Sequence, residues 1–295
     1  MKTRLFFFTL LAAASSLPSQ TLSTRYETYG TLIVTQLSTA PFPHPQRANG
    51  HMYDSTLYSA AEHYSDSSVA IFIPKGFRKT GSTDFVVHFH GWHNNIDSVF
   101  AQYHLIEQFS ASKKNAILIV PQGPRNAPDS FGGKLEDKDG FKKFMADIVK
   151  LLVKEKKIRT TKIGNIILSG HSGGYHVISF ILMRGGLTKH IREVYLFDAL
   201  YGETEKFVYW FTHQNGKLID IYTQNGGTKA ETESLIDDLN GWNIPCFARN
   251  EADASARDLR THRLVFLFSE LVHNDVVSAH KSFEQYLEAS ILRNK

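Results

Sequence analysis

The sequence predicts an α/β fold: a mainly parallel sheet of about eight strands, with an antiparallel start and helices on both faces. Short apolar runs bounded by turn residues recur along the chain, which is typical of buried strands. From about residue 98 these runs alternate with helical segments, an order that favours a parallel sheet covered on both sides. A length of 295 residues with 42% hydrophobic residues is sufficient for one large core.

Three strands are expected before the first helix. They cover residues 31–37, 69–73 and 84–90, and Pro74 and Gly91 end the second and the third. Because no helical pattern separates these strands, we expect them to start the sheet in antiparallel fashion.

The alternation begins with a helix over residues 98–112, a strand over 116–120 and a helix over 139–157. In the last of these, apolar residues recur at three- and four-residue steps, and lysines and an aspartate occupy the other side. This helix should therefore cover the sheet with one face. Its apolar positions are Phe141, Phe144, Met145, Ile148, Leu151 and Leu152.

The same alternation continues to the end of the chain. Further strands are expected over residues 163–168, 194–197, 218–222 and 264–268, and further helices over 175–184, 228–240 and 276–292. There is no internal repeat, low-complexity segment or linker rich in Pro, Gly or Ser, so one domain is predicted.

The N-terminus has the order of an export signal. Lys2 and Arg4 precede an apolar run over residues 5–14, and small and polar residues follow. Ten apolar residues are about half of the roughly 20 needed to cross a bilayer, which disfavours a membrane anchor. We expect a signal peptide over about 1–23, a mature single domain over 24–295 and a secreted or periplasmic protein without stable membrane insertion.

Charge and cysteine content argue against several classes of protein. A formal net charge of +4 gives no argument for a nucleic-acid partner. The single cysteine, Cys246, can form neither an intramolecular disulfide nor a thiolate zinc site. The core must therefore stabilise the fold.

The most informative segment is Gly170-His171-Ser172-Gly173-Gly174, which joins a predicted strand to a predicted helix. In a turn this tight, the residues two before and two after the serine must lack side chains, and the turn lifts Ser172 above the strand ends. The N–H of Gly173 lies at the start of the helix, where it can stabilise a developing oxyanion. The segment is therefore predicted to be a nucleophile elbow.

With this elbow in place, the chain resembles an exported, bacterial-type member of the α/β-hydrolase superfamily over about residues 30 to 292. The resemblance implies an oxyanion His-Gly after the third strand, the nucleophile after the fifth, an acid after the sixth or seventh and a histidine after the last. His90-Gly91-Trp92 fills the first place. It implies that the N–H of Trp92 is the second oxyanion donor beside Gly173, and that His90 is structural.

The histidines at 88, 90 and 93 also suggest a metal site, because alternating strand histidines can ligate zinc. However, the metallo-hydrolase pattern would have an aspartate where Trp92 stands, and no downstream Asp/His cluster supplies further ligands. We therefore predict neither a metal nor a cofactor.

His273 is the predicted general base, because it lies four residues beyond Ser269, just after the last strand. An imidazole can take the serine proton near neutral pH and return it to a leaving group. The alternative is His280, which falls on the apolar stripe of the predicted closing helix and is interpreted as a packing residue. His171 and His176 are expected to support or pack rather than to act as the base, which usually comes from a different loop.

Asp198 is the predicted triad acid, because it ends the 194–197 strand at the same sheet edge as Ser172. Its role would be to hold His273 in the required tautomer and to stabilise its cation. The loop 223–227 after the next strand has no carboxylate. Asp220, which lies within that strand, and Asp275, which is close to His273 in sequence, remain alternatives.

Substrate contacts are less well specified. Arg125 and Lys134 follow the fourth strand and are available for an anionic group, whereas Tyr201 and Trp210 could line an aromatic pocket. The alternatives are solvated loop charges and aromatic side chains packed in the core.

Together these features predict a serine hydrolase that forms an acyl-enzyme on an ester or amide bond of a small-molecule or peptide substrate. The short segment 199–216 disfavours a large lid and therefore favours soluble substrates. An esterase and a peptidase or amidase would share the triad. The alternative from another class is a non-catalytic carbohydrate- or cell-wall-binding protein on the same scaffold, which a fluorophosphonate probe would leave unlabelled.

Overall fold

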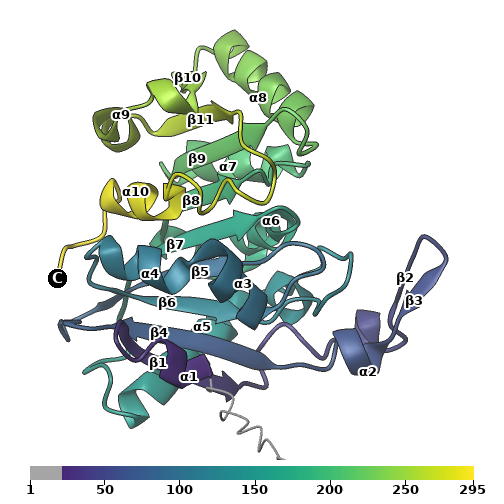
Figure 1. The fold of residues 1–295 in the computed structure, drawn as a ribbon, viewed down its shortest axis with the longest axis vertical. Coiled ribbons are helices and arrows are strands. Elements are labelled where there is room, and N and C mark those ends of the chain that lie inside the picture. The colour runs from purple at the N-terminus through teal and green to yellow at the C-terminus, as the bar shows by residue number, and fades with distance from the viewer. Residues whose placement is uncertain (1–21) are drawn as a thin grey trace, which may run out of the picture.

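The computed structural model describes residues 22–295, so residues 1–21 of the predicted signal peptide lie outside the described part. The described chain forms a nine-stranded sheet and a separate two-stranded hairpin (Figure 1). The strands are β1 Gly30–Gln36, β2 His51–Tyr53, β3 Thr56–Tyr58, β4 Ser68–Pro74, β5 Thr83–Phe89, β6 Ala116–Pro121, β7 Ile163–His171, β8 Ile191–Phe197, β9 Lys217–Thr223, β10 Phe247–Asn250 and β11 Leu264–Ser269.

The α-helices of the described chain lie before, between and after these strands. They are α1 Leu22–Arg25, α2 Ala60–His63, α3 Ile96–Tyr103, α4 Leu105–Ala111, α5 Gly140–Lys154, α6 Gly174–Arg184, α7 Thr204–His213, α8 Lys229–Gly241, α9 Ala256–Thr261 and α10 Ser282–Glu288. Short 3-10 helices cover Pro45–Arg47, Gly133–Glu136, Thr188–His190 and Glu251–Asp253. No helix within residues 22–295 is both long and apolar enough to cross a membrane.

The strand order in the sheet is β1-β4-β6-β5-β7-β8-β9-β11-β10. β1 pairs antiparallel with β4, β4 pairs antiparallel with β6, and all the other neighbouring strands are parallel. The predicted fold class and the antiparallel start are therefore confirmed. The sheet has one strand more than expected, because the short edge strand β10 carries only a weak apolar signal.

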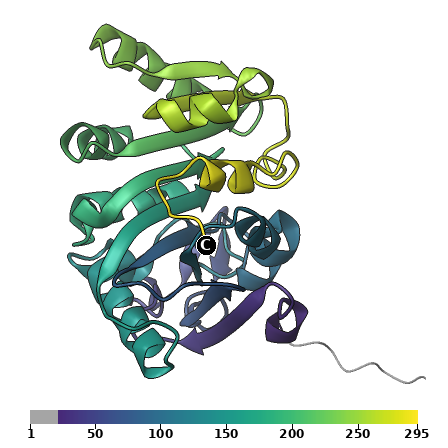
Figure 2. The same cartoon turned by 90° about the vertical axis from the view of Figure 1, so that its left-hand side faces the viewer.

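Both faces of the sheet are covered (Figure 2). Successive side chains of a strand point to opposite faces, so Val69 and Ile71 of β4 join one core cluster and Ala70 and Phe72 join the other. Buried residues of α5, α6, α7 and α8 belong to the first cluster, and those of α3, α4, α9 and α10 belong to the second. This two-sided burial explains why the central strands are mostly apolar at consecutive positions.

Two helical predictions need correction. The expected helix over 98–112 is broken into α3 and α4 at His104, which has a left-handed φ of 49°. The expected closing helix over 276–292 is shorter, because residues 274–280 form turns and only Ser282–Glu288 is helical. His280 therefore lies before the helix, where its exposed ring pairs with Glu251 at 3.2 Å instead of packing in the core.

Candidate active site

Ser172 lies at the sharp turn between β7 and α6. Its φ is +53°, a left-handed conformation that is strained for a residue with a side chain. A Cβ on Gly174 would lie 2.6 Å from the carbonyl oxygen of Phe89, and one on Gly170 would lie 2.8 Å from the side chain of Ile178. The two glycines of the motif are therefore required for the close approach of α6 to the sheet.

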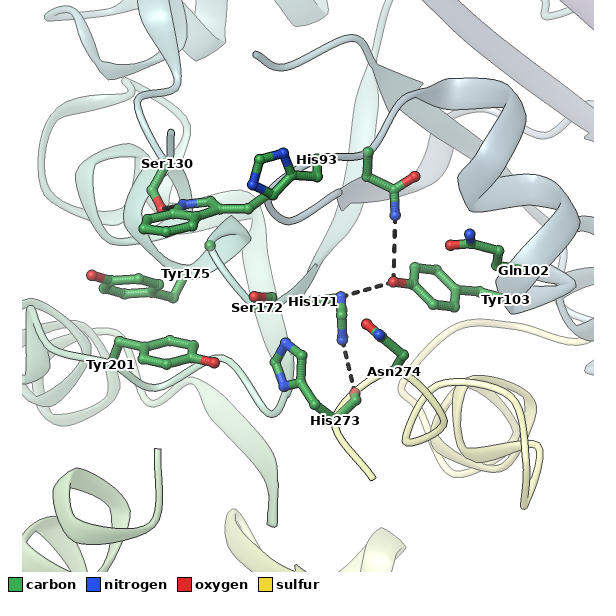
Figure 3. Close-up of a pocket in the computed structure, with 13 residues that line it drawn as sticks. His93, Gln102, Tyr103, Ser130, His171, Ser172, Tyr175, Tyr201, His273 and Asn274 are labelled. Carbon is green, nitrogen blue, oxygen red and sulfur yellow. Dashed lines mark hydrogen bonds between the residues drawn. The ribbon is translucent and has the colours of Figure 1, made fainter. Parts of the chain in front are cut away.

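His273 and Asp198 meet next to this turn. The Nδ1 of His273, from the loop after β11, lies 2.7 Å from Oδ2 of Asp198, from the end of β8. Ser172 and His273 line the same pocket (Figure 3). The structure therefore brings together the three residues that the sequence predicts for a triad.

Asp198 is fully buried but well supplied with donors. Thr223 donates to it from its backbone N–H at 3.3 Å and from its hydroxyl at 2.7 Å, and the hydroxyl of Thr228 also donates to it. Burial raises the pKa of Asp198, but the hydrogen bonds from His273, Thr228 and Thr223 outweigh that effect and hold the pKa below its usual value. The side chain is thus a carboxylate at neutral pH, suited to stabilising an imidazolium.

The two alternative acids do not contact His273. Asp220 is buried in β9, where its Oδ2 accepts from the hydroxyl of Thr232 at 2.8 Å and its Oδ1 has no partner. Burial raises the pKa of Asp220 to about 7. Asp275 is exposed in the loop after His273.

The segment His90-Gly91-Trp92 passes directly beside the serine. A Cβ on Gly91 would lie 2.6 Å from the Cβ of Ser172, and one on Gly173 would lie 2.8 Å from Cδ1 of Trp92. His90 is buried; its Nδ1 donates to the Gly91 carbonyl at 2.8 Å, and its Nε2 accepts from the N–H of Gly123 at 3.0 Å. His90 thus ties this segment to the loop after β6.

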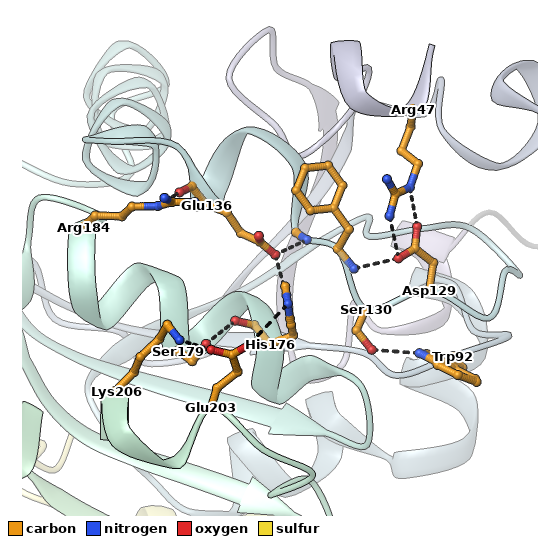
Figure 4. Close-up of polar contacts among 12 residues, drawn as sticks. Arg47, Trp92, Asp129, Ser130, Glu136, His176, Ser179, Arg184, Glu203 and Lys206 are labelled. Atoms are coloured by element: carbon orange, nitrogen blue, oxygen red, sulfur yellow. Dashed lines mark hydrogen bonds and ion pairs between the residues drawn. The ribbon is translucent and has the colours of Figure 1, made fainter. Parts of the chain in front are cut away.

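That loop, residues 122–136, reaches the pocket through Ser130 and is anchored at several points (Figure 4). Ser130 accepts from the indole Nε1 of Trp92 at 2.8 Å, and the buried Asp129 pairs with Arg47 at 2.7 Å. Glu136 is also buried and pairs with His176 of α6 at 2.9 Å. His176 is therefore a supporting residue, as expected.

Three of the four candidate substrate contacts lie outside the pocket. Arg125 pairs with Asp66 at 3.0 Å, and Lys134 donates to the carbonyl of Ser38 at 2.7 Å. Trp210 of α7 is fully buried in the core. The sequence places the two cations in the right loop, but loop residues face either the pocket or the scaffold, and spacing alone does not distinguish these directions.

The fourth, Tyr201, does line the pocket, which has a volume of about 510 Å³. Its hydroxyl donates to the carbonyl of Gly226 at 2.5 Å, and its ring lies 5.7 Å from that of Tyr175. Burial and the charge of Asp198 raise the pKa of Tyr201 to about 12, so the phenol is neutral. With Trp92, these rings form an aromatic side of the pocket.

The other side of the pocket is polar. Asn94, Gln102 and Asn274 contribute amides to it, and Tyr103 and His171 contribute a hydroxyl and an imidazole. No role for these residues could be predicted from the sequence, because Gln102 and Tyr103 lie in α3, whose pattern indicates only a covering helix, and Asn94 and Asn274 lie in loops. Asn94 alone has a signal in the sequence, because it closely follows the predicted oxyanion segment.

The remaining histidines of the 88–93 segment do not meet at one point. His88 is buried with its Nδ1 2.9 Å from the hydroxyl of Ser169, and burial lowers its pKa to about 3. His93 is exposed at the pocket rim. Within residues 22–295, no group of three or more His, Cys, Asp or Glu side chains is placed to hold a metal ion.

Comparison with known proteins supports the fold. No protein-family model matches the chain, and no curated protein matches it by sequence. A mutant feruloyl esterase module from Clostridium thermocellum, complexed with sinapinate, superposes with a TM-score of 0.56 at 11% identity over 88% of each chain. The substrate-bound fluorophosphonate-binding serine hydrolase F of Staphylococcus aureus gives 0.50 at 10% identity, over 89% of this chain and 99% of its own.

Proposed function

We propose that this chain, which has the α/β-hydrolase fold, is a serine esterase that cleaves small-molecule esters through an acyl-enzyme. The observation that carries the proposal is the meeting, at the end of the parallel strands, of a strained serine turn with a histidine bonded to a buried carboxylate. Hydrolases that use a triad need this arrangement.

In this proposal His273 takes the proton of Ser172 as the serine oxygen attacks the ester carbonyl carbon. The negative charge that forms on the carbonyl oxygen is stabilised by the backbone N–H groups of Trp92 and Gly173. Collapse of the intermediate breaks the ester bond, and His273 returns the proton to the departing alcohol. Water then attacks the acyl-enzyme in the same way, releasing the acid and free Ser172. Asp198 stabilises the imidazolium in both halves.

The pocket supports an ester that is aromatic on one side and polar on the other. Trp92, Tyr175 and Tyr201 offer ring faces, whereas Asn94 and Asn274 offer amides. One of the structural neighbours is a feruloyl esterase module bound to sinapinate, an aromatic carboxylate, which supports the same substrate class. Within residues 22–295, the pocket lining holds no Asp, Glu, Lys or Arg side chain, which favours an uncharged substrate.

Two measurements test this proposal. A fluorophosphonate probe should label the protein at Ser172, and hydrolysis should be fastest for aromatic acyl esters in a panel that also holds aliphatic esters, anilides and peptides. Preference for the anilides or peptides would indicate an amidase or peptidase. No labelling together with binding of oligosaccharides would indicate a non-catalytic carbohydrate-binding protein.

We also propose that the protein is exported, on the cationic, apolar and small-residue order of residues 1–23. The test is mass spectrometry of the mature N-terminus. Cleavage within about residues 14–23 would support export, and retention of Met1 in the cytoplasm would contradict it.

A further inference from the structure

His171, the residue before the proposed nucleophile, lies between two elements that are distant in sequence. Its Nδ1 is 3.0 Å from the hydroxyl of Tyr103 at the end of α3, and its Nε2 is 3.0 Å from the backbone carbonyl oxygen of His273 (Figure 3). Asn94 lies 3.4 Å from the same hydroxyl. The side chains of Asn94, Tyr103 and His171 are all buried.

The chemistry of these groups fixes the direction of each hydrogen bond. A carbonyl oxygen only accepts, so the Nε2 of His171 carries the proton. In a neutral imidazole Nδ1 is then an acceptor, and the hydroxyl of Tyr103 donates to it. The amide of Asn94 donates in turn to the tyrosine oxygen. The donors therefore point in one direction, from the loop before α3 to the loop that carries His273.

The contact holds the histidine loop in two ways. The hydrogen bond restrains the backbone at His273. The ring of His171 also lies 4.6 Å from the ring of His273, with a tilt of 39°, and therefore limits rotation of the His273 ring. This loop has no strand or helix between Ser269 and Ser282, and its own bonds are short-range turns. Gln108 also donates to the carbonyl of Val277 in this loop at 3.1 Å, and Asp198 bonds the ring of His273. His171 is the residue that bonds the backbone of His273 itself.

We propose that His171 is a positioning residue that sets the place of His273 through the backbone carbonyl of that residue, with Tyr103 fixing the tautomer of His171. The proposal rests on the proposed function in so far as His273 is the general base.

The neutral form of His171 is the one that fits. Burial, with the nearby charges of His273 and His90, lowers the pKa of His171 to about 4, while the carbonyl of His273 and the charge of Asp198 act in the opposite sense. Tyr103 and His88 are the other titratable side chains near the ring, and burial keeps both of them neutral. A second cation beside His273 would disfavour the imidazolium that catalysis requires.

A pair of substitutions separates the hydrogen bond from the bulk of the side chain. In His171→Gln the amide nitrogen can occupy the place of Nε2 and still donate to the His273 carbonyl, whereas in His171→Asn the amide reaches only the place of Nδ1. We expect His171→Asn and His171→Ala to lower kcat by about 10- to 100-fold with KM nearly unchanged, since small misplacement of a reacting group is costly. His171→Gln should stay within about threefold of the parent kcat, because the bond is kept.

His190 is the matched control. It also bonds a backbone carbonyl, that of Gly164 at 3.0 Å, but at the opposite end of β7 from Ser172. His190→Asn should leave kcat unchanged. Tyr103→Phe tests the same contact without changing His171, which matters if the buried His171 variants fold poorly. It should lower kcat by about 3- to 10-fold, which corresponds to the loss of one hydrogen bond.

Hydrogen–deuterium exchange of the peptide over residues 270–278 tests the positioning without any substrate. Exchange should be faster in His171→Asn and His171→Ala than in the parent and in His171→Gln. The proposal would be overturned if kcat and the exchange rate of His171→Asn equalled those of the parent. It would also be overturned if His171→Gln folded but lost as much kcat as His171→Ala. A parent that hydrolyses no ester but shows this exchange pattern would contradict the proposed function while supporting the positioning role.

Discussion

Two residues of the candidate triad share an unusual backbone conformation. Ser172 and Asp198 both have left-handed φ values, +53° and +47°, at the ends of neighbouring strands. The N–H of Ser172 donates to the carbonyl of Phe197 at 3.2 Å, and the N–H of Asp198 donates to the carbonyl of Ile221 at 2.7 Å. Each strained residue is therefore held by the next strand of the sheet. Such strain costs about 1–3 kcal/mol per residue and persists only where the surroundings fix it.

Replacement of Ser172 by alanine should abolish turnover, with a loss of about 10⁴-fold or more, because the nucleophile is removed. The thermal midpoint should stay within about 2 °C of the parent, since the hydroxyl contributes little packing and alanine carries the same backbone strain. Ester hydrolysis and a thermal melt measure the two effects. Activity within tenfold of the parent would contradict the assignment of Ser172.

Replacement of Asp198 by asparagine should cut turnover by roughly 10⁴-fold with the fold retained, because an amide cannot stabilise the imidazolium and can favour the wrong histidine tautomer. Asp220→Asn is the matched control, since it changes a buried carboxyl on the next strand that does not contact His273. Its kcat should stay close to that of the parent. A larger loss for Asp220→Asn than for Asp198→Asn would show that the acid is misassigned.

At the scale of elements, the place of Ser130 in the pocket depends on how loop 122–136 is anchored. The ion pair between Arg47 and Asp129, whose side chains are 18% and 6% exposed, anchors the middle of this loop. Burial raises the pKa of Asp129, but hydrogen bonds from Arg47 and from the N–H of Phe131 hold it below the usual value. The carboxylate is thus stable only while these donors are present.

Arg47→Met should therefore destabilise the protein by about 3 kcal/mol, because it leaves a buried charge without its partner. It should also raise KM, since Ser130 follows Asp129 directly and holds the indole of Trp92. Arg125→Met is the control: Arg125 lies in the same loop with its side chain 48% exposed, and exposed pairs contribute only about 0–1 kcal/mol. Urea unfolding and steady-state kinetics check both variants, and equal effects of the two would be contrary to this account.

The helices and strands that the sequence predicts are those in which apolar residues recur with a clear period. The central strands and α5, α6 and α8 are found where apolar residues repeat clearly, and each end differs by only a few residues. The hairpin of β2 and β3 was not predicted, because its exposed Met52 and Leu57 give no buried-strand pattern. It projects from the body of the molecule at the right of Figure 1.

The residues of the candidate site also divide into those that the sequence predicts and those that it does not. Ser172, His273 and Asp198 could be placed from the sequence because each follows a strand whose position in the sheet is set by topology. The polar side of the pocket could not, because Asn94, Gln102 and Tyr103 come from a loop and a helix whose rotation depends on packing. The interpretation of His280 as a packing residue is wrong for a related reason, since the turns after His273 delay the start of α10.

At the scale of the whole molecule, Asp220 links stability to pH. Burial raises its pKa to about 7, against the opposing hydrogen bond from Thr232 and with a further rise from the charge of Asp198. Between about pH 4 and pH 7 the folded chain keeps this proton and the unfolded chain loses it. Stability should therefore fall as pH rises through this window, by up to about 1.4 kcal/mol per pH unit from this group.

Asp220→Asn should remove that part of the pH dependence. We expect the parent to lose stability relative to the variant from pH 5 to pH 8, as measured by urea unfolding at each pH unit. Identical pH dependence in the two proteins would mean that Asp220 ionises freely in the fold.

The order of the triad along the chain also has a consequence during synthesis. His273 follows Asp198 by 75 residues and depends on β11, which pairs in the sheet only with β9 and β10. A nascent chain that has released β7 and β8 from the ribosome already contains the nucleophile and the acid but no base. Under the proposed mechanism, ester cleavage begins only when the C-terminal strand has emerged and joined the sheet. Under that mechanism, a translation product that ends before His273 is inactive.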